Sequence, residues 1–113
     1  MDMPAQLSEL RRAVPGCHVA AFVDLSARMV LSHDARSKAP QERLDGLADR
    51  ARQLLSAPGL PGVDHAMAIS GDSLELFLGA GDDGLALVCG TGTDVEAALT
   101  HARAVLGGVT CDA

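Results

Sequence analysis

Residues 18–31 read HVAAFVDLSARMVL, and the apolar run within them decides the fold. Residues 19–23 are apolar without a break, whereas a strand with one solvated face alternates apolar and polar side chains. The run therefore predicts a central strand that is covered on both faces of a sheet. The stretch 24–28 predicts a turn, and residues 29–31 predict a short second strand that completes a hairpin.

Helices are expected on both sides of this hairpin. Upstream, apolar residues at every third or fourth position predict a helix over residues 4–14 that Pro15-Gly16 ends. Downstream, residues 33–39 are polar and lack periodicity, and Pro40 suits the first turn of a long helix. Two Pro-Gly pairs at residues 58–62 end that helix. Its apolar stripe consists of Leu44, Leu47, Ala48, Ala51, Leu54 and Leu55.

The second half of the chain predicts three strands and a final helix. The strands are expected at about residues 65–70, 74–78 and 85–89. The stretches 71–73 and 79–84 between them have the composition of hairpin turns. Thr93-Asp94-Val95-Glu96 matches a capping box, which predicts the start of a helix, and Gly107-Gly108 is expected to end it.

These elements predict an α+β fold of the profilin-like type. The order helix, strand, strand, helix, strand, strand, strand, helix gives a central five-stranded antiparallel sheet in a three-layer sandwich. A chain of 113 residues suits a single domain, residues 1–113, with its core at about residues 4–107.

Charge and composition exclude several kinds of partner. The formal net charge is -6, and the chain contains two phenylalanines but no tryptophan and no tyrosine. Nucleic acid and anionic membranes both require a basic footprint, so neither is expected as a partner. No apolar run approaches the roughly 20 residues that cross a bilayer, and no signal peptide is recognisable. Three widely spaced cysteines fit a reduced, cytoplasmic setting.

Motifs that could indicate catalysis are weak. Gly90-Thr91-Gly92-Thr93 lacks the third glycine and the lysine of phosphate-binding loops. The four histidines never stand at i and i+4, so no metal motif is present. We therefore expect no catalytic residue, no metal ligand and no cofactor. Cys17 and Cys89 are expected on neighbouring antiparallel strands, and a disulfide between them is not expected in the cytoplasm.

The chain resembles the Roadblock/dynein light chain family from about Leu7 to Leu106. The opening helix that ends in Pro-Gly, the strand from His18 to Leu25 with Asp24 before its turn, and Asp94-Val95 at the last helix are similar to the family pattern. The usual Asp-x-x-Gly turn lacks its glycine here. Longin domains share the kernel of two strands, a helix and three strands, but they lack the leading helix and carry an extra trailing one.

The resemblance implies a non-catalytic dimeric platform. Members of the family bind or regulate Ras-like small GTPases, or serve as light chains in motor and signalling complexes. Their sheets typically continue from one subunit into the other through the third strand and the helix before it. The alternative function is a small-molecule sensor or degenerate enzyme with a pocket between helix and sheet.

The residues themselves give some support to such a dimer. The third strand has no inward lysine, no proline and no bulge signal, so it would invite association as a free edge. The second helix has an apolar and arginine flank that suits contact between helices. The expected homodimer interface is Arg43, Leu47, Arg50, Leu54, Ala66, Met67, Ala68 and Ile69.

A basic island accompanies the second helix. Residues 36–52 contain five basic and three acidic residues, whereas the rest of the chain contains four and twelve. Such asymmetry can steer an acidic partner, and Arg36, Lys38 and Arg52 are the expected partner-binding residues. A solvated helix face with intrahelical ion pairs is the alternative explanation.

Overall fold

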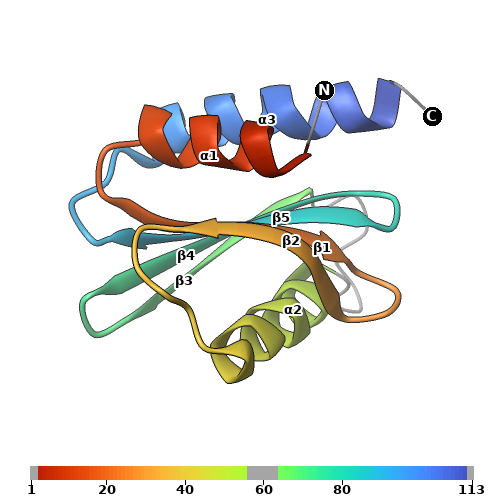
Figure 1. Ribbon diagram of the computed structural model, residues 1–113, viewed down its shortest axis with the longest axis horizontal. Helices are drawn as coiled ribbons and strands as arrows, with labels where there is room; N and C mark the ends of the chain where they lie inside the picture. Colours follow the sequence, from red (N-terminus) through yellow and green to blue (C-terminus); the bar gives the residue numbers. More distant parts are fainter. Residues whose placement is uncertain (1–2, 56–63, 112–113) are drawn as a thin grey trace.

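The computed structural model describes residues 3–55 and 64–111, which form three helices and one five-stranded antiparallel sheet (Figure 1). The strand order is β2-β1-β5-β4-β3. The predicted fold class and element order are confirmed. The elements are α1 (Met3–Ala13), β1 (Cys17–Asp24), β2 (Met29–Ala35), α2 (Gln41–Leu55), β3 (His65–Ser70), β4 (Ser73–Ala80), β5 (Asp83–Gly90) and α3 (Val95–Cys111).

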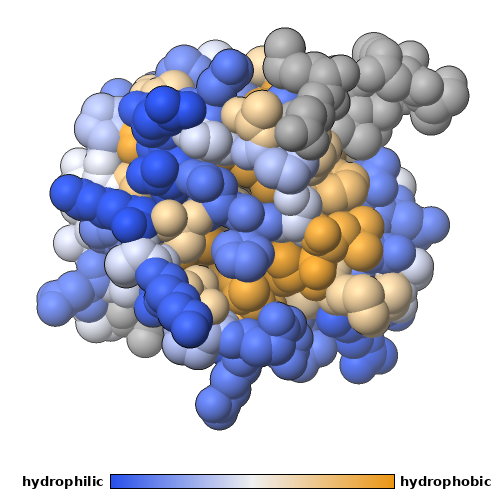
Figure 2. Space-filling view, in the orientation of Figure 1, coloured by the Kyte–Doolittle hydropathy of each residue, from blue (hydrophilic) through white to orange (hydrophobic). Residues whose placement is uncertain are grey.

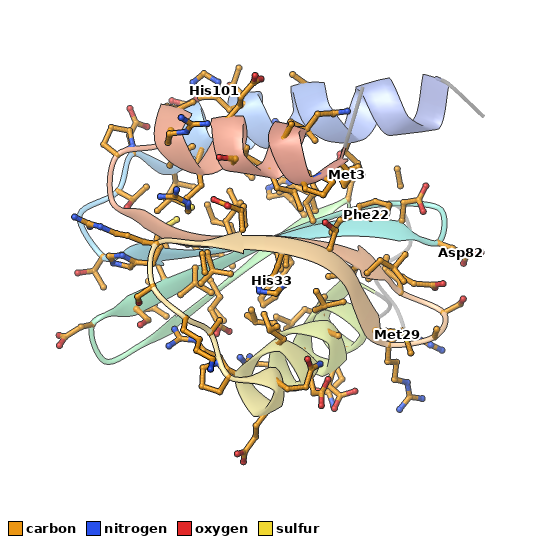
Figure 3. All side chains as sticks on the ribbon, viewed as in Figure 1. Met3, Phe22, Met29, His33, Asp82 and His101 are labelled. Carbon is orange, nitrogen blue, oxygen red and sulfur yellow. The ribbon has the colours of Figure 1, made fainter. Side chains whose placement is uncertain are left out.

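The sheet is covered on both faces, as the apolar run in β1 predicts. Figure 1 shows α1 and α3 on one face and α2 on the other. Successive side chains of a strand point to opposite faces, so Ala20 packs in the α1/α3 layer and Ala21 in the α2 layer. Phe77 fills the α2 layer and is fully buried. Phe22 lies on the α1 side, near Met3 (Figure 3).

The second strand is longer than its apolar residues indicate. β2 continues through His33 and Asp34 to Ala35, where a polar stretch without periodicity was expected. Because β2 is an edge strand, solvent and α1 can satisfy its polar side chains, and Asp34 forms an ion pair with Arg11. A β-bulge interrupts the pairing of β1 with β2 between Phe22 and Val23.

The turn between β4 and β5 is shorter than predicted. β4 extends to Ala80 and β5 begins at Asp83, so the loop expected over residues 79–84 shrinks to Gly81 and Asp82. Gly81 adopts a φ of 64°, which glycine reaches without the steric cost of a Cβ atom. The tighter turn extends the pairing of β4 with β5 to Ala80 and Asp83.

The last helix starts at a different residue and ends later than predicted. Oδ1 of Asp94 accepts a hydrogen bond from the backbone N–H of Ala97 at 3.1 Å, so Asp94, and not Thr93, is the N-cap. The helix passes through Gly107-Gly108 and continues to Cys111. Glycine weakens a helix by roughly 1 kcal/mol per residue but, unlike proline, does not block it.

The end of α1 depends on one glycine. Gly16 has a φ of 87°, and a Cβ atom at this position would lie 2.8 Å from Oγ1 of Thr93. Its carbonyl oxygen also accepts a hydrogen bond from the backbone N–H of Gly90 at 3.0 Å. The turn after α1 therefore packs closely against the turn before α3, and this leaves no room for a larger residue.

Candidate functional site

The first candidate surface is the free edge of the sheet at β3. This strand is terminal in the sheet and pairs with β4 only, within the part of the chain that the structure describes. Met67 and Ile69 are 50% and 64% exposed, whereas Ala68 packs against the α2 layer. The register pairs Met67 with Leu76 and Ile69 with Leu74, so both exposed side chains lie on the α1/α3 side of the sheet.

The flank of α2 does not form one continuous ridge with this edge. Leu47, predicted at the interface, is fully buried in the α2 layer, because it lies three residues after Leu44 in the same buried stripe. Leu54 is partly buried, and Arg43 is exposed. The Nε and Nη2 atoms of Arg50 donate to the two carboxylate oxygens of Glu75 at 2.7 and 2.8 Å, which fixes Arg50 against β4.

The three predicted partner-binding cations do not lie together. Arg36 and Lys38 line a surface cleft before α2, which they share with Arg43. Arg52 lies in the last turn of α2, where its Nη1 atom donates to the carbonyl oxygen of Leu25 at 3.1 Å. The basic island therefore divides into three parts: a cluster near the start of α2, Arg50 paired with Glu75, and Arg52 in contact with the β1–β2 turn.

That β1–β2 turn closes without a glycine. Oδ1 of Asp24 accepts hydrogen bonds from the backbone N–H groups of Ser26 and Ala27, both at 3.0 Å, and from the hydroxyl of Ser26 at 2.8 Å. These bonds, led by that from Ala27, lower the pKa of Asp24. Arg28 takes the positive φ, 54°, that the turn requires. Hydrogen bonds to one carboxylate thus stabilise a conformation that is unusual for arginine.

Two buried thiols meet between β1 and β5, as predicted. Cys17 and Cys89 are paired directly across the strands, and both are free and buried. The Sγ atom of Cys17 lies 3.4 Å from the carbonyl oxygen of Val19. A side-chain hydrogen bond with Cys89, together with burial, raises the pKa of the Cys17 thiol. These thiols belong to the core and are poorly placed for nucleophilic chemistry.

A second apolar patch lies on the opposite edge of the sheet. Figure 2 shows apolar residues gathered over β2 and the end of β1. Met29 and Leu31 of β2 are 53% and 54% exposed, respectively. Sequence reasoning missed this patch, although the apolar run at residues 29–31, which puts apolar side chains on both faces of a strand, is a signal that could have found it. The bulge beside Phe22 distorts this edge, whereas β3 pairs with β4 in unbroken register.

Within residues 3–55 and 64–111, no group of three or more His, Cys, Asp or Glu side chains could hold a metal ion. Over the same residues, no helix is long and apolar enough to span a membrane.

Comparisons with known proteins show what the fold is. No protein-family model matches the chain, and no curated protein matches it. A solved Roadblock/LC7 domain from Streptomyces avermitilis is 18% identical, with a TM-score of 0.82 over 97% of this chain and 96% of that one. MglB from Myxococcus xanthus is 12% identical, with a TM-score of 0.77 over 97% and 95% of the two chains.

A further solved structure bears on self-association. It is described as MglB with a tetrameric arrangement and is 18% identical, with a TM-score of 0.68 over 93% of this chain and 86% of that one. Identities this low establish the fold and not the activity. From α1 to α3, this chain has the Roadblock/LC7 fold.

Proposed function

We propose that this chain is a non-enzymatic cytoplasmic domain that forms a homodimer and binds and modulates a Ras-like small GTPase or a larger signalling or motor complex. The observation that carries the proposal is the bare edge of β3 with Met67 and Ile69 exposed beside it. The small-GTPase component follows from the Roadblock resemblance. The homodimer is also consistent with the tetrameric arrangement of MglB, a protein of the same fold.

The β3 edge is better suited to pairing than the β2 edge. An edge strand presents unpaired backbone N–H and C=O groups, and pairing with a second β3 would satisfy them. None of the four residues of β3 from Ala66 to Ile69 is Lys, Arg, Asp or Glu. β2, in contrast, has a bulge and the charged residue Asp34, both of which natural proteins use to discourage edge pairing.

Sedimentation of the purified chain tests the dimer. At micromolar concentration the wild type is expected to sediment at about twice its chain mass of 11.6 kDa. Ile69→Lys is expected to shift it to the mass of one chain, because a charge would be buried at the shared edge. Leu31→Lys is the matched control: it places the same charge on β2 at a residue of similar exposure, and it should leave the dimer intact.

Two results would contradict this interface. A wild type that sediments as a single chain would remove the dimer altogether. Dissociation by Leu31→Lys and not by Ile69→Lys would move the interface to the β2 edge. Circular dichroism of both variants checks that each has kept its fold.

Capture from a cell lysate tests the GTPase partner. The tagged domain is incubated with lysate that contains either GDP or a non-hydrolysable GTP analogue, and mass spectrometry identifies the retained proteins. We expect a Ras-like GTPase to be retained in one nucleotide state. Arg36→Gln with Lys38→Gln should lower its recovery severalfold, because the two cations at the start of α2 would contact the acidic partner.

The double variant Arg12→Gln with Arg28→Gln is the control for capture. It removes the same charge from exposed positions outside the cleft and should retain the GTPase. If the wild type retains no GTPase and its native mass spectrum shows a bound small molecule, the sensor function replaces this proposal.

A further inference from the structure

A cationic cleft opens at the end of the sheet where β2 leads into α2. Its volume is about 250 Å³. Arg36 and Lys38 line it from the connection between β2 and α2, and Arg43 lines it from the first turn of the helix. Ser37 of the same connection, His18 at the start of β1 and Ser73 at the start of β4 complete the polar part of its wall. Residues far apart in the sequence are thus brought to one cleft.

The cations of this cleft differ from two other arginines of the molecule, which are paired with carboxylates. Arg11 pairs with Asp34, and Arg50 pairs with Glu75. Within residues 3–55 and 64–111, no ion pair involves Arg36, Lys38 or Arg43.

The acids nearest in sequence do not neutralise the cleft. Glu42 and Asp45 belong to the same end of α2 but do not line the cleft. Asp45 instead accepts a hydrogen bond from the side-chain amide of Gln41 at 2.9 Å. The cleft therefore concentrates positive charge on a chain whose net charge is -6. Repulsion elsewhere on the surface would restrict an anion to this place.

We propose that this cleft binds a phosphate-class oxyanion. Two guanidinium groups and an ammonium group can each donate to phosphoryl oxygens, and guanidinium does so through two parallel hydrogen bonds. The Ser73 hydroxyl is a further donor in the wall. No phenylalanine, tyrosine or tryptophan lines the cleft, so it lacks a large aromatic ring on which a nucleobase could stack. A phosphoryl group, either on a small molecule or on a phosphorylated side chain of another protein, fits this chemistry.

This inference goes beyond the proposed function, because it concerns the isolated chain and requires neither a dimer nor a GTPase. The two proposals meet at Arg36 and Lys38. An anion in the cleft would neutralise cations that the protein partner is proposed to contact, so its occupancy would weaken capture of that partner.

Amide NMR of the isotope-labelled chain tests the cleft directly. Inorganic pyrophosphate is titrated against sodium chloride at equal ionic strength, so that general screening cancels. We expect saturable shifts confined to residues 18–19, 36–43 and 73. Arg36→Gln with Arg43→Gln should weaken the apparent affinity at least about tenfold, because two charge-assisted contacts are lost. Arg12→Gln with Arg28→Gln should change it less than about twofold, since those residues lie outside the cleft.

Two probe peptides separate the possible sources of the phosphoryl group. A peptide with one phosphoserine is compared with its unphosphorylated form and with pyrophosphate. Tighter binding of the phosphopeptide than of pyrophosphate supports a group carried on a protein, and the reverse supports a small molecule. Well-dispersed spectra of both variants show that they have folded.

Three results would overturn the inference. They are shifts that do not saturate, shifts that scatter over the whole surface, and equal weakening by the two double variants. Citrate bound as tightly as pyrophosphate would overturn the assignment to phosphoryl chemistry. Failure of GTPase capture leaves this inference standing, and failure of anion binding leaves the GTPase proposal standing.

Discussion

At the scale of single residues, Leu47 and Leu54 lie seven positions apart on α2 and have different surroundings. Leu47 is fully buried between α2 and the sheet, whereas Leu54 packs at the margin of the same cluster. Burial of a leucine side chain stabilises a protein both through transfer from water and through the contacts of a filled core. Leu47 therefore acts on folding, and Leu54 retains surface for an interface.

Alanine substitutions separate these two roles. Leu47→Ala is expected to lower the free energy of unfolding by about 2–5 kcal/mol, because it leaves a cavity in a closed core. Leu54→Ala is expected to cost less than about 2 kcal/mol, because its site is already partly open to solvent. Urea denaturation at one fixed protein concentration measures both values, since a dimer's stability depends on concentration. Equal losses would contradict the burial difference.

At the scale of elements, the start of α3 depends on the side chain of Asp94. The first four N–H groups of a helix lack partners within the helix, and the Asp94 carboxylate accepts from one of them, that of Ala97. Thr93 instead directs its hydroxyl to the carbonyl oxygen of Pro15, at 3.4 Å. Thr93, the first residue of the predicted capping box, thus connects two turns and does not cap the helix.

The two residues are predicted to differ in their contribution to stability. Asp94→Ala should lower the free energy of unfolding by about 0.5–2 kcal/mol, the usual effect of losing an N-cap. Thr93→Ala should cost less, because its hydrogen bond is long. Thermal unfolding monitored by circular dichroism ranks the two variants. A larger loss for Thr93→Ala would contradict this ranking.

At the scale of the whole molecule, the charges and the free edges lie in separate regions. Within residues 3–55 and 64–111, α1 and α3 cover one face of the sheet and α2 covers the other, and β2 and β3 are the two edge strands (Figure 1). The unpaired cations of the cleft lie at the end of the sheet, near the start of α2. Self-association through the β3 edge alone would therefore leave the cleft open, whereas an interface that also included Arg43 would cover part of it. A dimer formed through that edge alone would then present two cationic clefts, one in each subunit.

The sequence was enough to assign most candidate site residues to their strand or helix, but it did not show which of these residues lie together in space. The strand at residues 65–70 lacks an inward lysine, a proline and a bulge signal, which indicated a free edge that could pair with another strand. The sheet order confirms that β3 is an edge. Helical spacing placed Leu47 both in the inward stripe and on the flank, because a projection at about 100° per residue does not show how wide the buried face is. The separation of Arg52 from Arg36 and Lys38 depends on the length of α2, which puts them at opposite ends.

The sequence by itself determined the layers and the element order, because these follow from local periodicity and from hairpin connections. Tertiary structure decided the extension of β2 through Asp34, the cap at Asp94 and the composition of the cationic cleft. Each of these depends on a group that is distant in the chain or on a choice between neighbouring donors and acceptors. Packing in three dimensions sets such choices, and short-range sequence patterns carry no information about that packing.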